Sequence, residues 1–444
     1  MTKVKATYSD IWRISYPIML GSLAQTILGL TDTAFMGRVG EVELGAVGIA
    51  SVFYFVLVML GFGIGIGGQI LIARKSGEGK TKEIGIIFDH SLLLLVGFSV
   101  FLFVFIRWCS PFIFDAILNS ENVKVAANTF IAYRCWGIIG VMITVAFRSF
   151  YTGIATTRII TYSSFLMTSI NVLLGYVLIF GHFGFPAMGI AGAGLASAIS
   201  ETITAIYLLI YTYFKKEFLV YQLFRFLNSG ERVFLKVMNL SAPIMLQHLI
   251  SMGAWFLFFV FIEKLGEHAL AISNVVRSTY MLLMTPIWGF AAAANSMTSN
   301  LIGQEKKEEV LSLLKKICTL SLMTTFIMVL LNVLFPSFIL GITTSDAGLI
   351  SDSKGSFYVV CGAMILFCIS FVLFSGVSGT GNTKIAMFME IGNIFIYFLY
   401  VYVCAHIIKT NVEWVWVVEI LYWLLMGIFS YVYLLGNHWK KIKL

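Results

Sequence analysis

Charged residues are scarce in this chain. Asp, Glu, Lys and Arg together make up 12% of its 444 residues, whereas hydrophobic residues make up 59% and the mean hydropathy is +0.92. Average soluble domains carry about 25% charged residues. The composition therefore excludes a soluble globular protein and predicts a chain that lies within a lipid bilayer.

The motifs of common soluble enzymes are also missing. The sequence holds no GxxxxGK[ST] phosphate loop, no HExxH zinc motif and no paired spacing among its six histidines. A GxGxxG match at residues 63–68 lies inside an apolar run, where it predicts close helix packing and not a nucleotide site. The six cysteines show no CxxC spacing, which argues for reduced packing residues and against a disulfide framework or a zinc site. We expect neither an enzyme nor a cofactor.

Long apolar runs separated by short polar ones number twelve, and each is long enough to cross a bilayer, which takes about 20 residues. Their approximate centres are Leu23, Met59, Gly97, Gly140, Asn171, Ser200, Ile250, Leu283, Met323, Leu366, Ile396 and Leu424. The first run is longer than a signal-peptide core, so we interpret it as a mature span. The sequence predicts an all-α integral membrane protein with twelve transmembrane helices.

Lysine and arginine are distributed unevenly along the chain, whose net charge is +8. Most lie at the N-terminus, in the even-numbered connections or at the C-terminus. Because cytoplasmic connections are enriched in basic residues, we expect both termini in the cytoplasm and a multi-pass protein of the cytoplasmic (inner) membrane. The basic residues are spread along the cytoplasmic ends of the spans and do not cluster on one soluble surface, so a nucleic-acid partner is not expected.

The chain repeats itself without a gap, at a constant shift in residue number. Residues 17–20 (Pro-Ile-Met-Leu) return as residues 243–246 (243 − 17 = 226). Six spans fall in each copy, so both copies begin on the same side of the membrane and the repeats are parallel. We expect an N-terminal six-helix lobe (residues 1–214) and a C-terminal six-helix lobe (residues 237–444). Residues 215–236 join them as a cytoplasmic linker, either an amphipathic surface segment or a plain loop.

Asp32 is the clearest polar residue at membrane depth. It lies in the outer half of the first span, where a carboxylate costs about 2.5 to 3.5 kcal/mol on insertion scales. The second copy has Phe258 at the equivalent position, so the repeat itself does not require an acid there. We hypothesise that Asp32 handles an ion. The alternative is an ordinary span-end residue hydrogen-bonded to Thr31 or Thr33.

Two further polar residues supply oxygen atoms at membrane depth. Asn171 lies near the middle of the fifth span and Ser197 in the outer half of the sixth. Oxygen ligands of this kind suit a hard cation such as sodium, and Asn171 is equally suited to position a protonatable Asp32. The alternative for Asn171 is a hydrogen bond that holds two helices together, and for Ser197 a small residue at a close helix contact.

Glu201 lies near the midpoint of the sixth span, with no basic partner nearby in the sequence. We expect it to face a water-filled cavity, where a proton or a cationic ligand accompanies it.

Pro17 lies inside the first span, where a proline removes a helix hydrogen bond and allows a bend. That bend either differs between conformational states or is a static kink.

Several of these residues occur in a recognisable order. They are Pro17 fifteen positions before Asp32, the run 31–38, the Gly77 loop, the stretch 147–158, residues 171–174 with 178–181, and residues 185–193. In this order, and with the repeat, the chain resembles the multidrug and toxic compound extrusion (MATE) family over essentially its whole length. The resemblance implies a V-shaped pair of six-helix lobes that exports organic, often cationic compounds in exchange for Na+ or H+. It also implies that Asp32 and Asn171 belong to the cation site of the N-terminal lobe.

The chain departs from the family pattern in two places. Many prokaryotic relatives have a second aspartate four residues after the asparagine, where this chain has Gly175. The acid that other branches use in the seventh span is also missing, in the region of Gln247, His248 and Ser251. With one carboxylate fewer, Na+ and H+ both stay open as the coupling ion. We place Glu201, as a compensating acid, and Gln247 at the substrate cavity.

The leading hypothesis is a secondary-active antiporter in which an ion at Asp32 changes the bend of the first span and the shape of the N-lobe cavity. The alternative is a flippase of a lipid-linked or polyanionic substrate, whose cavity should be markedly basic. An intramembrane enzyme lacks its nucleophile or metal constellation here, and a passive channel gains little from an acid in one lobe. Expected partners are small organic substrates and membrane lipids, and one chain is sufficient as a monomer.

Overall fold

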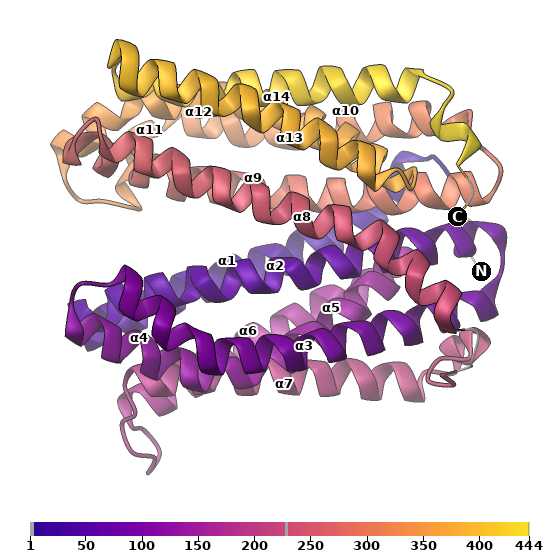
Figure 1. Cartoon of the computed structure of the whole chain (residues 1–444), viewed down its shortest axis with the longest axis horizontal. Coiled ribbons are helices and arrows are strands. Elements are labelled where there is room, and N and C mark those ends of the chain that lie inside the picture. The colour runs from indigo at the N-terminus through magenta and orange to yellow at the C-terminus, as the bar shows by residue number, and fades with distance from the viewer. Residues whose placement is uncertain (1–3, 227–229, 443) are drawn as a thin grey trace. The chain divides into compact units, whose positions relative to one another are not determined.

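The computed structural model describes residues 4–226, 230–442 and 444, which are mostly helical and contain no strand (Figure 1). The helices of the first half are α1 (Tyr8–Val39), α2 (Glu41–Glu78), α3 (Thr81–Ile117), α4 (Glu121–Arg134), η1 (Cys135–Gly137), α5 (Ile138–Gly153), α6 (Arg158–Phe180), α7 (Ile190–Phe214) and η2 (Lys216–Tyr221). Those of the second half are α8 (Gly230–Glu263), α9 (Glu267–Gly303), α10 (Glu309–Leu334), α11 (Pro336–Gly341), α12 (Ala347–Gly379), α13 (Thr383–Tyr402), η3 (Val403–Ile408), α14 (Val412–Leu435) and η4 (Trp439–Lys441).

The described helices form twelve long segments, as the apolar runs predict. α4, η1 and α5 make one continuous span, and α13 continues into the π-helix η3. Eleven segments are long and apolar enough to cross a membrane. The remaining one, α9, has 37 residues and is less apolar, because it carries Glu267 and Arg277 in its first half and uncharged polar residues such as Asn295 in its second. The prediction of an all-α, multi-pass membrane protein is confirmed.

The helices group into two compact units. The N-terminal unit is Leu20–Met245, and the C-terminal unit combines Met1–Met19 with Leu246–Leu444. In the N-terminal unit α5 packs against α2, α3 and α7, and in the C-terminal unit α12 packs against α9, α10 and α14. The two sets of helices correspond through the shift of the repeat, so the sequence repeat is also a repeat of helix packing.

The unit boundaries differ from the predicted lobes at the first helix of each copy. α1 begins within the C-terminal unit and joins the N-terminal unit at Leu20, and α8 makes the opposite change at Leu246. Pro17 and Pro243 lie just before these two points, both inside their helices. Because a proline cannot donate a helix hydrogen bond, each helix is weakened close to where it passes from one unit to the other.

Close backbone contacts hold the first part of α8 within the N-terminal unit. A Cβ atom added at Gly63 would overlap Met245, and one added at Gly67 would overlap Ser241. The Ser241 hydroxyl donates to the carbonyl of Ile64 at 3.3 Å. The glycine run at residues 63–68 therefore serves close helix packing, as predicted, because only residues without a side chain let α2 and α8 approach this closely.

A buried carboxylate fixes the described part of the linker to the N-terminal unit. Asp89 on α3 accepts backbone N–H groups from Phe224 at 2.8 Å and from Arg225 and Phe226 at 3.0 Å each. The linker begins with the short helix η2 and its last part is already helix α8, whereas residues 227–229 of the predicted linker lie outside the described residues. The connection is thus bound to one unit over much of its length.

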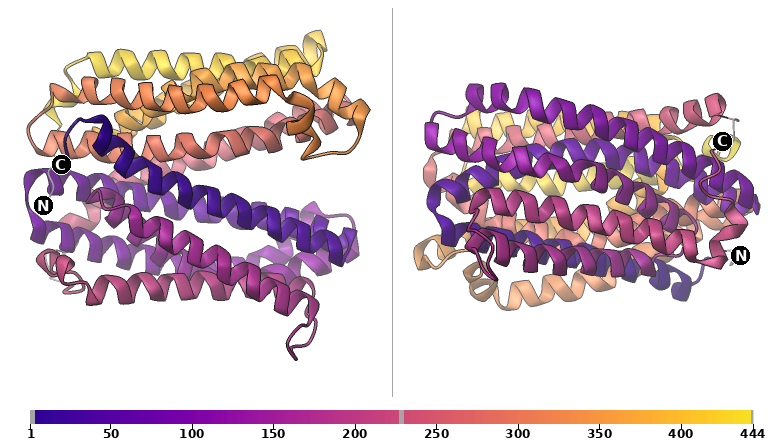
Figure 2. Two further views of the ribbon diagram at one scale, coloured as in Figure 1. Left: turned by 180° about the vertical axis from the view of Figure 1, so that it is seen from behind. Right: turned by 90° about the horizontal axis from the view of Figure 1, so that it is seen from below.

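The connection between α6 and α7, residues 181–189, projects past the ends of these two helices (Figures 1 and 2). Gly181 and Gly189 both have positive φ, which lets the chain turn sharply at the end of α6 and at the start of α7. Phe183 in this connection is 85% exposed.

We predict that Gly67→Leu destabilises the protein by about 1 to 3 kcal/mol, because the new side chain overlaps Ser241 in a packed interface. Thermal denaturation in detergent measures the effect. Gly97→Leu is the matched control, since a Cβ at Gly97 meets nothing within 4 Å. Equal stability of the two variants would contradict the assignment of Gly67 to a helix contact.

Candidate functional site

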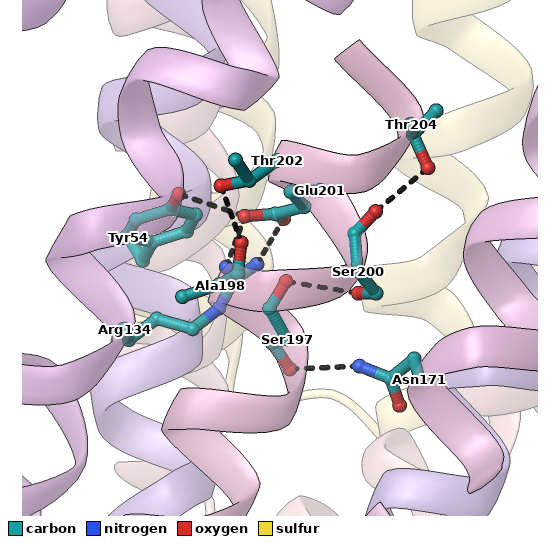
Figure 3. Close-up of polar contacts among 9 residues, drawn as sticks. All are labelled: Tyr54, Arg134, Asn171, Ser197, Ala198, Ser200, Glu201, Thr202 and Thr204. Carbon is teal, nitrogen blue, oxygen red and sulfur yellow. Dashed lines mark hydrogen bonds and ion pairs between the residues drawn. The ribbon is translucent and has the colours of Figure 1, made fainter. Parts of the chain in front are cut away.

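One face of α7 carries a buried polar stripe in the interior of the N-terminal unit (Figure 3). Ser197, Ser200, Glu201 and Thr204 follow one another at spacings of one, three or four residues, which places them on neighbouring positions of the helix surface. The Ser200 hydroxyl donates to the Ser197 carbonyl at 2.9 Å and the Thr204 hydroxyl to the Ser200 carbonyl at 2.7 Å. The side chains of Ser197 and Glu201 form hydrogen bonds that reach other helices.

Glu201 forms a bidentate ion pair with Arg134 at the end of α4. The two terminal guanidinium nitrogens donate to the two carboxylate oxygens at 2.5 and 2.6 Å. The Tyr54 hydroxyl on α2 donates to the same carboxylate at 3.5 Å, and the guanidinium lies over the Tyr54 ring, 4.1 Å from its centroid. The expected companion of Glu201 was a proton or a cationic ligand, and the structure gives it the side chain of Arg134 instead. Arg134 lies 67 residues away, so the sequence around Glu201 holds no basic residue that points to this pair.

Two glycines explain how α7 comes this close to the fourth span. A Cβ at Gly137 would overlap the Glu201 carboxylate, and a Cβ at Gly140 would approach the Glu201 backbone to 2.9 Å. Both glycines lie directly after Arg134, in η1 and α5. Arg134 thus ends one helix segment, and Gly137 and Gly140 follow it without side chains. Their lack of side chains leaves space for the buried ion pair.

One helical turn before Glu201, Ser197 binds Asn171 of α6. The Asn171 amide nitrogen donates to the Ser197 hydroxyl oxygen at 2.9 Å. Asn171 is only 1% exposed, and its side-chain oxygen is buried without a hydrogen-bond partner. An unpaired buried carbonyl oxygen costs about 1 to 3 kcal/mol, so this atom is an available acceptor for a proton donor or a cation.

Contacts between α1 and α6 lie on either side of Asp32 along the chain. On one side of it, the Thr168 hydroxyl of α6 donates to the Ala24 carbonyl of α1 at 3.1 Å. On the other side, the Phe35 ring lies 3.3 Å from where a Cβ of Gly175 would be. At 3.6 residues per turn, Ala24 and Phe35 lie within about 20° of each other around α1, and Asp32 lies about 80° from the first and about 60° from the second. Asp32 is thus to one side of the line of α1 that contacts α6, less than a quarter turn away.

The Asp32 carboxylate makes no hydrogen bond or ion pair within the described residues. Thr31 and Thr33 donate to the Ile27 and Gly29 carbonyls of their own helix, each at 2.9 Å. The alternative that Asp32 is a span-end residue bound to these threonines is therefore wrong. Among the described residues, no hydrogen-bond donor or basic group contacts the Asp32 carboxylate.

The equivalent position of the C-terminal unit is aromatic. Phe258, the counterpart of Asp32, is 1% exposed and packs against Trp416 and Tyr397 with ring centroids 5.0 and 5.9 Å apart. Tyr397, the counterpart of Asn171, donates its hydroxyl to Glu419 of α14 at 3.2 Å. The two units therefore share a packing pattern but differ in the chemistry of this region.

The C-terminal unit has its own buried carboxylates, Glu419 and Glu390. The Tyr280 hydroxyl and the Trp423 indole N–H donate to Glu419 at 2.8 and 3.2 Å. Both Ser251 and Tyr422 donate to Glu390 at 2.6 Å. Among the described residues, these two acids receive hydrogen bonds from neutral groups only.

Gln247 belongs to the C-terminal unit, whereas Glu201 belongs to the N-terminal unit. The Gln247 backbone carbonyl accepts the Ser251 hydroxyl at 2.9 Å, one turn from the contact of Ser251 with Glu390. Its side chain is half-buried. A role for Gln247 and Glu201 in one substrate cavity stays a prediction.

We predict that Arg134→Met lowers the free energy of unfolding by about 3 to 5 kcal/mol, because it leaves Glu201 as a buried carboxylate without its cation. The double variant Arg134→Met/Glu201→Leu should recover most of this loss. SDS or thermal denaturation in micelles compares the three proteins. A double variant as unstable as the single one would contradict a direct interaction between the two side chains.

The helices, the internal repeat and the buried polar groups define a class of polytopic membrane protein built from two six-helix units. The model of the MatE family matches residues 17–177 and 243–403, two stretches that correspond end to end through the shift of the repeat and together cover more than half of the chain. The chain belongs to the MatE family of transporters.

Similar proteins agree with this assignment. Two relatives are called probable multidrug resistance protein NorM. The one from Photorhabdus laumondii is 26% identical over 78% of this chain and 76% of its own, and the one from Thermotoga maritima is 25% identical over 84% and 80%.

Solved structures show the same fold. A MOP superfamily transporter from Pyrococcus furiosus, for which reverse polarity of the binding pocket suggests a different function, has a TM-score of 0.91 at 18% identity, over 98% of this chain and 97% of that one. The Vibrio cholerae MATE transporter VcmN has a TM-score of 0.89 at 15% identity, over 98% of both chains.

Proposed function

We propose that the protein is a secondary-active antiporter that exports small organic compounds, often cationic, in exchange for Na+ or H+ bound at Asp32. The observation that supports this most directly is the placement of Asp32. Its carboxylate has no hydrogen-bond partner among the described residues, α1 contacts α6 on either side of it, and the side-chain oxygen of Asn171 on α6 is unpaired. A carboxylate without a partner is expensive within a membrane span, so a bound cation or proton relieves its cost.

Exchange follows if the two ligands prefer different states of the protein. A cation at Asp32 stabilises the state in which the carboxylate and the Asn171 oxygen share it, and the organic cargo stabilises another state. Pro17 gives α1 a point of low bending stiffness fifteen residues before Asp32. Ser197 supports the site by accepting a hydrogen bond from the Asn171 amide nitrogen. The side-chain oxygen of Asn171 is then not bound to Ser197.

The cargo is proposed from the relatives. Two of them are named as probable multidrug resistance proteins, which favours a range of small organic compounds over one metabolite. The exchange needs no covalent chemistry, and we therefore propose a monomeric transporter without a cofactor and without catalytic activity. A flippase of an anionic, lipid-linked substrate is the second candidate. Its cavity should be basic, whereas Arg134, the buried cation described above, is already bound to Glu201.

We predict that Asp32→Asn abolishes ion-driven export. The protein is reconstituted into vesicles, and movement of a fluorescent cationic dye is recorded under a Na+ gradient and, separately, under a proton gradient. Wild type should respond to at least one gradient, and the variant should respond to neither, because asparagine carries no charge to attract a cation.

Asp115→Asn is the matched control, since Asp115 is an exposed acid whose nearest basic group, Lys124, lies 3.9 Å away. It should transport like wild type. Dye movement that keeps its ion dependence in Asp32→Asn would overturn the proposed function. Wild-type protein that moves no dye but translocates a fluorescent lipid would point to the flippase.

The orientation gives a separate prediction. With both termini in the cytoplasm, the loop at Lys80 lies inside the cell and the start of α4 at Glu121 lies outside. In intact cells, a membrane-impermeant maleimide should label Glu121→Cys above the wild-type background and should label Lys80→Cys only after permeabilisation. The reverse pattern would require the opposite orientation.

A further inference from the structure

We propose that the groove between α3 and α4 binds the head group of a phospholipid, with the lipid phosphate at Arg107 and a primary ammonium group, as in phosphatidylethanolamine, at Asn128. The groove lies within the N-terminal unit, where α3 and α4 pack side by side (Figure 1). Neither residue belongs to the candidate functional site, so lipid binding here does not depend on which ion or cargo the protein exchanges.

A small cavity of about 60 Å3 lies between the two helices. Its wall includes Arg107, Ser110 and Pro111 of α3 and Asn128 and Ala132 of α4. On each helix these residues follow one another at spacings of one, three or four, so each helix turns one face to the cavity. The volume suits several water molecules or a small polar group and is far below that of a site for a drug-sized compound.

Arg107 supplies a cation without a partner. Its side chain is exposed, and no acid or other acceptor among the described residues pairs with its guanidinium. Lys124, one helical turn before Asn128, is by contrast within 4 Å of two acids, Asp115 at 3.9 Å and Glu121 at 3.4 Å. A planar guanidinium donates two parallel hydrogen bonds to a phosphate, which makes Arg107 the suitable phosphate ligand of this groove.

Asn128 and Pro111 leave acceptors in the same wall. The side-chain oxygen of Asn128 is buried and has no hydrogen-bond partner. Pro111 lies inside α3 and has no N–H, so the Arg107 carbonyl four residues earlier does not receive its usual helix hydrogen bond. A buried acceptor without a donor costs about 1 to 3 kcal/mol. A primary ammonium group next to the phosphate carries the donors that this side of the cavity lacks.

The groove lies at the depth of lipid head groups. Residues 91–106 of α3 hold no charged residue and span about 24 Å, most of the thickness of the hydrocarbon core, and Arg107 follows directly. Trp108 is exposed on α3, and the exposed Trp136 packs against Phe103 with ring centroids 4.8 Å apart. Because tryptophan is enriched where a membrane meets water, the molecule closest at hand to fill this cavity is a membrane lipid.

The experiment measures lipid binding directly. Full-length, delipidated protein in detergent is titrated with dihexanoyl phosphatidylethanolamine, and the lipid adduct is followed by native mass spectrometry. The half-saturating concentration should be at least about tenfold lower than that of dihexanoyl phosphatidylcholine, which corresponds to about 1.4 kcal/mol. The two lipids share the phosphate, but the trimethylammonium group of phosphatidylcholine has no N–H to donate to Asn128.

Three variants change the site in different ways. Arg107→Gln removes the cation, whereas Ala132→Leu keeps it and fills the cavity, and each should raise the half-saturating concentration of phosphatidylethanolamine at least about tenfold. Asn128→Leu removes the acceptor and should abolish the preference for phosphatidylethanolamine over phosphatidylcholine. If Ala132→Leu fails to elute as a single species from a sizing column, Arg107→Gln still decides the result, because Arg107 is exposed and its replacement disturbs no packing.

Arg38→Gln is the matched control. Arg38 is an exposed arginine at the end of α1 and is not part of the wall of this cavity. The control should bind phosphatidylethanolamine like wild type, since a built site, and not basic charge in general, holds the lipid.

Equal binding of the two lipids by wild type, or equal binding of phosphatidylethanolamine by wild type and Arg107→Gln, would overturn the inference. Phosphoethanolamine and inorganic phosphate, titrated in parallel, separate the two sources of the same chemistry. If either soluble compound binds at the concentrations at which the lipid binds, the groove is a site for a free phosphate compound and the lipid assignment is wrong. Binding of the lipid alone supports the head-group site.

Discussion

The cost of placing charge within a membrane governs the interior of both units. A charged side chain near the bilayer centre costs about 2.5 to 3.5 kcal/mol on insertion scales, so each buried acid needs a neighbour that offsets the cost. Glu201 has Arg134, whereas Glu390 and Glu419 have hydroxyl and indole donors. Asp32 has neither kind of close partner among the described residues. In the proposed function, its partner is a cation or a proton supplied from outside the protein.

The internal repeat separates what the scaffold requires from what the site requires. The helices of the two units pack in the same pairs, so this arrangement is a property of the repeat. Asp32 and Asn171, by contrast, are replaced by Phe258 and Tyr397 in the second copy. Phe258 packs against both Tyr397 and Trp416, so the space that is polar in one unit is filled by aromatic rings in the other.

Helix packing and electrostatics are linked through glycine. Gly137 and Gly140 let α7 approach the fourth span so closely that both terminal guanidinium nitrogens of Arg134 bind Glu201. Gly63 and Gly67 play the corresponding part for α8, whose first half packs within the N-terminal unit. Without a strong hydrophobic force between helices in lipid, such close backbone contacts supply much of the packing energy.

The sequence by itself determined the membrane class, the twelve spans and the twofold repeat, because apolar length and a constant shift between the two copies are local or periodic signals. It also singled out Asp32 and Asn171, since polar residues in an apolar span are conspicuous. Only the tertiary structure decided that Glu201 is paired with Arg134, that the Asn171 oxygen is unpaired, and that α1 and α8 each belong to both units. These features depend on contacts between helices far apart in the chain, and no pattern along one helix specifies which side chain of another will meet it.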